Sequence, residues 1–168
     1  MSLLCFFFYF NLKKVPQELS DSKQEPISNP YGKLLQTNSK ILNQNEFINR
    51  LKTYELYDDS VLLQMDKQAI FYEVTWEESY PEEKNYQAAL VGLFVVSKEK
   101  STPQVSYAKV TSKSLHEPKS GKWVETNSAV QSNLPQKNCE VAVTGHFVMK
   151  SFRETRAIIM TMQEIFTP

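Results

Sequence analysis

The chain has 168 residues, 19 Lys and Arg against 19 Asp and Glu, and only four glycines, which lie far apart. This length fits one domain with an appendage. The balanced charge argues against a basic nucleic-acid groove, and the scattered glycines exclude a glycine-rich phosphate loop. We therefore expect neither a nucleic-acid partner nor a bound cofactor.

Residues 1–12 are mainly apolar and are followed by Lys13 and Lys14. The run is about ten residues long, whereas roughly 20 are needed to cross a bilayer core. It has no basic segment before it and no small residues at its end, so it does not match a secretory signal. Three interpretations stay open: the end of a truncated membrane anchor or signal, an interfacial anchor, or a buried segment of the fold. The first is favoured.

Residues 13–40 are rich in Pro, Ser, Gln, Asn and Lys and contain few adjacent apolar residues. Such a composition buries too little apolar surface to order itself, which predicts a flexible stalk. Residues 41–168 then form the compact domain. This layout predicts a membrane-anchored protein whose domain is extracytoplasmic. A cytoplasmic domain is the alternative, because Lys13 and Lys14 follow the apolar run.

The domain begins with a predicted helix over Asn43–Tyr57, in which Phe47, Leu51 and Tyr54 recur at helical spacing. Asn43 or Asn45 is a candidate N-cap, and a strand at its end is the competing interpretation. Alternating or continuously apolar segments then predict strands at Val61–Met65, Ile70–Trp76, Tyr86–Val96, Gln104–Lys113, Trp123–Val130, Cys139–Met149 and Thr155–Phe166.

Six or seven strands separated by turn signals predict a mainly β domain, either an antiparallel β-sandwich or a strongly curved sheet, with one N-terminal helix. The strands at Tyr86 and Cys139 are too long and too apolar for edges. Gly92 within the former indicates a bulge or a close backbone approach. The last two strands form a hairpin, with residues 150–154 as its tip.

The order of a short apolar N-terminus, a stalk, a helix at Asn43–Tyr57 and a curved antiparallel sheet is similar to that of nuclear-transport-factor-like periplasmic domains of secretion and conjugation machines. The similarity is one of layout. It implies an alternative fold, an α+β cone with the helix packed in the concave side of the sheet. It also implies a structural subunit of a membrane transfer apparatus.

Catalytic and metal-binding patterns are weak. Cys139 and His146 are seven residues apart on one predicted strand, so their side chains should lie on opposite faces and cannot form a nucleophile–base pair. His116 and His146 are the only histidines, and neither belongs to a recognised metal-ligand spacing. We expect no disulfide between Cys5 and Cys139, no metal and no catalytic residue.

Two groups of residues are candidate binding surfaces. Aromatic side chains flank an acidic loop at 77–84, and basic residues surround a phenylalanine at the hairpin tip. Aromatic residues beside charged ones are common in protein interfaces. The candidate binding residues are Trp76, Tyr80, Tyr86, Lys150, Phe152, Arg153 and Arg156.

These observations favour a non-enzymatic, membrane-tethered or exported domain that binds a protein partner. The first alternative is the structural subunit of a secretion or conjugation apparatus. The second is a hydrolase that uses carboxylates near the acidic loop, for which Glu73 and Glu77 are available.

Overall fold

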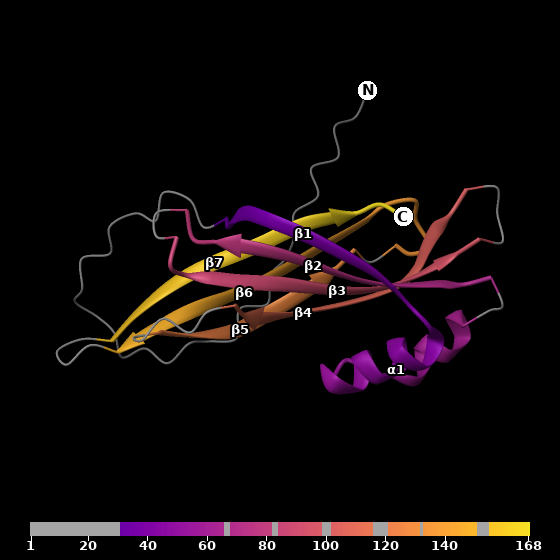
Figure 1. The fold of residues 1–168 in the computed structure, drawn as a ribbon, viewed down its shortest axis with the longest axis horizontal. Coiled ribbons are helices and arrows are strands. Elements are labelled where there is room, and N and C mark those ends of the chain that lie inside the picture. Colours follow the sequence, from indigo (N-terminus) through magenta and orange to yellow (C-terminus); the bar gives the residue numbers. More distant parts are fainter. Residues whose placement is uncertain are drawn as a thin grey trace, which may run out of the picture.

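The computed structural model describes residues 31–65, 68–81, 84–98, 102–115, 121–131, 133–150 and 155–168. Within these residues the strands form two antiparallel sheets (Figure 1). One sheet has the order β1 (Lys33–Leu42), β2 (Ile70–Ser79), β3 (Gln87–Ser97) and β4 (Gln104–Ser114), and the other has the order β5 (Gly121–Val130), β6 (Cys139–Lys150) and β7 (Thr155–Phe166). The predicted mainly β, antiparallel fold is confirmed.

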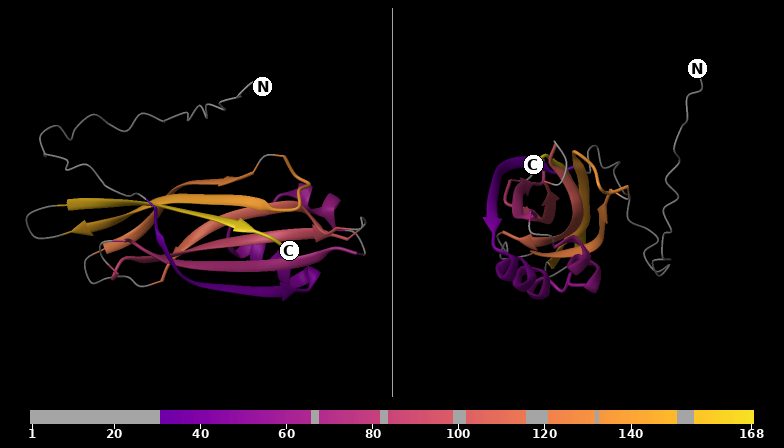
Figure 2. Two further views of the ribbon diagram at one scale, coloured as in Figure 1. Left: turned by 90° about the horizontal axis from the view of Figure 1, so that it is seen from above. Right: turned by 90° about the vertical axis from the view of Figure 1, so that its right-hand side faces the viewer.

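The two sheets curve towards each other and enclose the main core (Figure 2). Aromatic rings join them across this core. Phe94 of β3 stacks on Phe166 of β7 with centroids 4.1 Å apart, and Tyr86 contacts Phe147 of β6 at 5.2 Å. Burying such rings contributes much of the stability of a sandwich, because each removes a large apolar area from water.

Strand β3 is buried from Ala88 to Val96, which confirms the predicted internal strand. One of its faces packs on the second sheet. The other packs on a smaller cluster under the helix, which contains Leu42, Phe47, Leu51, Val61, Phe71, Leu93, Val95 and Tyr107. Gly92 marks a close approach, because a Cβ there would overlap the ring of Phe94 and lie 3.0 Å from Trp76.

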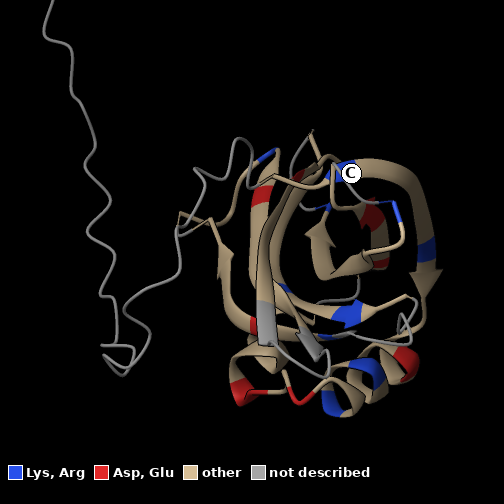
Figure 3. Ribbon diagram, turned by 90° about the vertical axis from the view of Figure 1, so that its left-hand side faces the viewer, with Lys and Arg blue, Asp and Glu red and all other residues tan. Residues whose placement is uncertain are grey.

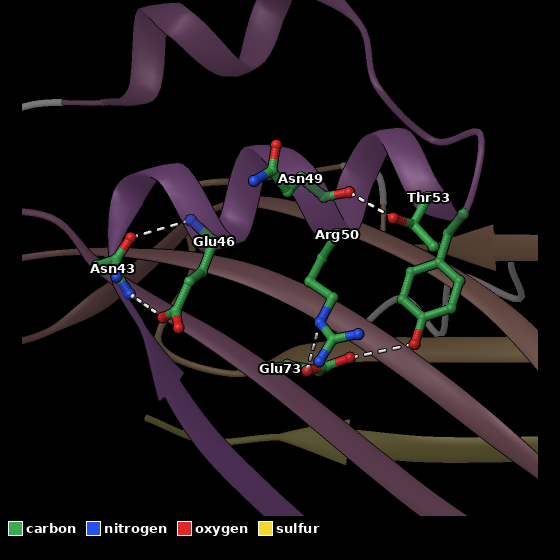
Figure 4. A network of polar contacts seen from close by, with 7 residues as sticks. Asn43, Glu46, Asn49, Arg50, Thr53 and Glu73 are labelled. Carbon is green, nitrogen blue, oxygen red and sulfur yellow. Dashed lines mark hydrogen bonds and ion pairs between the residues drawn. The ribbon is translucent and has the colours of Figure 1, made fainter.

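Helix α1 (Gln44–Thr53) confirms the predicted helix and its cap. Asn43 accepts a hydrogen bond from the Glu46 N–H, and Glu46 accepts one from the Asn43 N–H, each at 3.0 Å (Figure 4). This capping box satisfies two N–H groups that the helix leaves unpaired. The helix ends before the predicted Tyr57, because the backbone turns into the left-handed region at Glu55.

Arg50 anchors α1 to the sheet. Its guanidinium lies 3.3 Å from the Glu73 carboxylate of β2, which also accepts a hydrogen bond from the Tyr54 hydroxyl at 3.2 Å (Figure 4). The helix therefore lies on the face of the four-stranded sheet that is turned away from the second sheet. The cone-like alternative, which requires the helix in the concave side, does not fit this arrangement.

Two predicted segments are wrong. Residues 61–65 do not form a strand: the first four belong to the 3₁₀ helix η1 (Asp59–Gln64), and Met65 is its C-cap. Asp58 caps the start of η1 by accepting a hydrogen bond from the Ser60 N–H at 3.0 Å. The predicted stalk extends too far, because Lys33–Leu42 is strand β1. Nine of its ten residues are exposed. An edge strand that buries so little has the composition of a linker, and only its pairing with β2 orders it.

Candidate functional site

The predicted aromatic binding edge is not on the surface. Trp76 is 4% exposed and Tyr86 is 7% exposed, and both belong to the main core. Tyr80 is partly buried against the same core. The reason is that β2 continues to Ser79, through the start of the predicted acidic loop, and directs Trp76 into the space between the sheets. These side chains hold the sheets together.

The predicted basic tip stays a prediction. Phe152 and Arg153 lie outside the described residues. Lys150 is the last residue of β6 and pairs with Thr155, and Arg156 is the second residue of β7 and pairs with Met149. The side chains of Lys150 and Arg156 also lie outside the description.

The predicted separation of Cys139 and His146 is confirmed. Cys139 is a fully buried free thiol, and burial raises its pKa to about 11. His146 lies on the outer face of β6, in a row with Val124 and Ile159 of the neighbouring strands. The two cannot act as a nucleophile and its base.

The carboxylates proposed for hydrolysis are also apart. Glu73 and Glu77 share one face of β2 four residues from each other, a separation of about 13 Å along a strand. Glycosidase pairs lie roughly 5 to 9.5 Å apart. Glu73 is moreover bonded to Arg50 and Tyr54 of the helix region. Among the described residues, no group of three or more His, Cys, Asp or Glu is placed to hold a metal ion.

A feature that sequence reasoning missed lies at β1. Paired residues of antiparallel strands direct their side chains to the same face, so the partners of inward-facing β2 residues also face inward. Those partners are Leu34, Thr37, Ser39 and Ile41, and all four are exposed. Ile41 is 63% exposed. Among the described residues, the three-stranded sheet has no strand that covers β1.

Within the part of the chain that the structure describes, β7 is an edge strand of its sheet, and it lies beside β1. The Gly32 N–H donates to the Thr161 carbonyl at 2.9 Å, and this junction joins the edges of the two sheets. Past it the two strands run apart (Figures 1 and 2). Because backbone direction alternates along a strand, Gln163 and Ile165 turn their N–H and C=O groups to the same open side as Thr161. We name Leu34–Ile41 and Met162–Phe166 together the β1–β7 seam.

One carboxyl group, that of Glu78, stands at the closed end of the seam, and a second, that of Glu164, belongs to β7 three residues past Thr161. Glu78 of β2 is 2% exposed, and its Oε1 has no hydrogen-bond partner among the described residues. Its Oε2 lies against Gly32, where any Cβ would overlap it. Burial, and then the charge of Glu164 on β7, raise the pKa of Glu78 to about 8. Burial also raises the pKa of Glu164.

Charges are otherwise dispersed. Basic and acidic positions both occur along the strands and on the helices (Figure 3). Among the described residues, no helix combines the length and the apolar character needed to cross a membrane. Compared with protein-family models, curated proteins and solved structures, the chain has no significant match.

Proposed function

We propose that this chain is a non-enzymatic interaction domain that binds an extended segment of a protein partner along the β1–β7 seam. The observation that carries the proposal is the exposed inner face of β1 beside the open edge of β7. A strand added to β7 would lie opposite β1 and bring the second sheet to four strands. The proposal keeps the hypothesis, drawn from the sequence, that the chain is a binding domain. It places the binding surface at the β1–β7 seam instead of at the acidic loop or the hairpin tip.

The backbone of β7 supplies the affinity in this proposal. Unpaired N–H and C=O groups along a sheet edge form a template for another strand. Gln163 and Ile165 would each offer a donor and an acceptor to the added segment. Hydrogen bonds of this kind depend on the partner's backbone, so they favour extended segments of many sequences.

The side chains of β1 would select among such segments. Leu34 and Ile41 are exposed and apolar, whereas Thr37 and Ser39 between them are polar. Alternate side chains of an added strand face one side. The best partner is therefore an extended segment with apolar residues at the two ends of the contact and small or polar residues in its middle.

The proposal also places the domain at a membrane, with residues 1–12 as the attachment and the polar residues that follow as a linker of about 20 residues. The extracytoplasmic side is proposed, because a linker holds the seam away from the surface, where partners reach it. Deletion of residues 1–28 should then abolish membrane attachment without closing the seam.

A proline at Gln163 tests the binding surface. The backbone N–H of Gln163 points away from β6. Gln163→Pro therefore removes a donor of the open edge and leaves the hydrogen bonds to β6 intact. The probe is a set of ten-residue peptides selected from a random library on the full chain. Their affinity for Gln163→Pro should fall at least about tenfold, the loss expected from one blocked backbone bond.

The matched control is Gln163→Ala, which keeps the N–H and should bind within about threefold of the parent chain. Both variants should unfold at a similar denaturant concentration. Equal affinity of the proline and alanine variants, or selected peptides that shift only the NMR signals of other surfaces, would refute the seam as the binding site.

A further inference from the structure

The junction between the two sheet edges is built directly over a buried carboxyl group. Gly32 donates to Thr161 at 2.9 Å, and the Glu78 carboxyl lies beneath Gly32. A glycine is required there, because a Cβ would overlap Oε2 of Glu78. A movement of the Glu78 side chain would therefore displace Gly32 and disturb its hydrogen bond to Thr161.

Among the described residues, no basic side chain pairs with Glu78. Its register neighbours, Leu34 on β1 and Ala88 on β3, carry no charge. The charged group that acts on it from β7 is Glu164, which has the same sign. A buried carboxylate without a cation or sufficient hydrogen bonds is costly, whereas the neutral acid is tolerated.

We propose that Glu78 is a proton-operated switch of the seam: the protonated side chain keeps the Gly32–Thr161 junction closed, and the ionised side chain releases β1 from β7. This adds regulation to the binding surface proposed above. The switch itself requires no partner, whereas its effect on partner binding rests on the proposed function.

The direction of the pH dependence follows from linkage. The pKa of Glu78 is about 8 with the junction closed, whereas a carboxyl that reaches water on opening returns to its ordinary value of 4.5. Between these pH values closing takes up a proton, so each rise of one pH unit weakens closure about tenfold. Closure is strongest in acid, weakens up to about pH 8 and is constant above it. Acid therefore closes the Gly32–Thr161 junction, and neutral to mildly alkaline conditions open it.

Hydrogen exchange at the Gly32 amide measures the junction directly in the full chain. Protection factors, which are corrected for the intrinsic effect of pH, would be recorded by NMR between pH 5 and 8. The parent chain should lose protection by about tenfold per pH unit. Glu78→Gln, which imitates the neutral acid, should show no such slope. The matched control Glu77→Gln lies next to it on the other face of β2 and should behave as the parent chain does.

The proposal would be overturned if protection of the Gly32 amide in the parent chain did not depend on pH. It would also be overturned if Glu78→Gln kept the same dependence of that protection on pH. If Glu78→Gln does not fold, titration of the Glu78 carboxyl carbon by ¹³C NMR in the parent chain decides instead. A midpoint near 8 with a matching change in Gly32 supports the switch, and a midpoint near 4.5 refutes it.

The selected peptides separate this proposal from the proposed function. If both hold, opening the junction adds the Thr161 carbonyl to the edge that peptides already bind, so peptide affinity rises with pH in the parent chain. Glu78→Gln then keeps the lower, pH-independent affinity of the closed junction. If the Gly32 slope is present but no peptide binds the seam, the switch stands and the proposed binding function fails. If peptides bind the seam with no Gly32 slope, the binding function stands and the switch fails.

Discussion

The reactivity of a single side chain in this protein depends on the face of the strand on which it lies. Cys139 faces the core, and burial raises the pKa of its thiol to about 11. The thiolate is the reactive form of cysteine. At pH 8 the folded protein should therefore hold far less thiolate at Cys139 than an unfolded chain does.

We predict slow alkylation of Cys139 in a Cys5→Ser variant. At pH 8 its reaction with iodoacetamide should be at least about 100-fold slower in the folded protein than in urea, because a rise of two pKa units lowers the thiolate fraction by that factor and burial adds to it. Mass spectrometry of quenched samples follows the reaction. Rates within about tenfold of each other would show that the thiol is accessible.

At the scale of elements, the sheets are joined by a polar contact as well as by the core. Glu125 of β5 accepts hydrogen bonds from the Thr111 hydroxyl at 3.0 Å and from the Ser112 N–H and hydroxyl at 2.7 Å each. The Ser112 hydroxyl also accepts from the Trp123 indole at 2.8 Å. The β5–β6 register shifts next to Glu125. One carboxylate thus links the last strand of the first sheet to the first strand of the second.

Removing this link should destabilise the domain. Glu125→Ala leaves the Ser112 N–H without its acceptor, and we expect a loss of about 1–3 kcal/mol in the free energy of unfolding. Glu125→Gln keeps an acceptor and should lose less. The exposed Asn127→Ala on the same strand is the control. Urea unfolding provides the measurement, and an effect of Glu125→Ala no larger than the control's would contradict the assigned role.

At the scale of the whole molecule, the two hydrophobic clusters of the described residues extend from Leu42 to Phe166. A variant that lacks residues 1–28 should therefore keep its cooperative unfolding, with a midpoint within about 4 °C of the full chain. The same variant should no longer sediment with phospholipid vesicles, whereas the full chain should. A larger loss of stability would show that the N-terminus is part of the fold, and equal sedimentation would refute the proposed attachment.

Most strands were predictable because burial on one face leaves an alternating pattern, as in Ile70–Trp76, and burial on both faces leaves a continuous one, as in Tyr86–Val96. The helix was predictable from its cap and from Phe47 and Leu51. Strand β1 was not, because an edge strand exposed on both faces carries no such pattern. The candidate site was missed for the same reason: exposed residues of β1 and an edge of β7 have no local signal.

The sequence alone determined the helix α1, the strands β2 to β7 and the face on which their residues lie, since these depend on neighbours along the chain. This includes the opposite faces of Cys139 and His146. Only the tertiary structure decided which strands are edges, that Trp76 lies inside, and that Glu78 lies under Gly32 within reach of the charge of Glu164. These depend on contacts between segments about 45 to 130 residues apart in the chain, which no local pattern records.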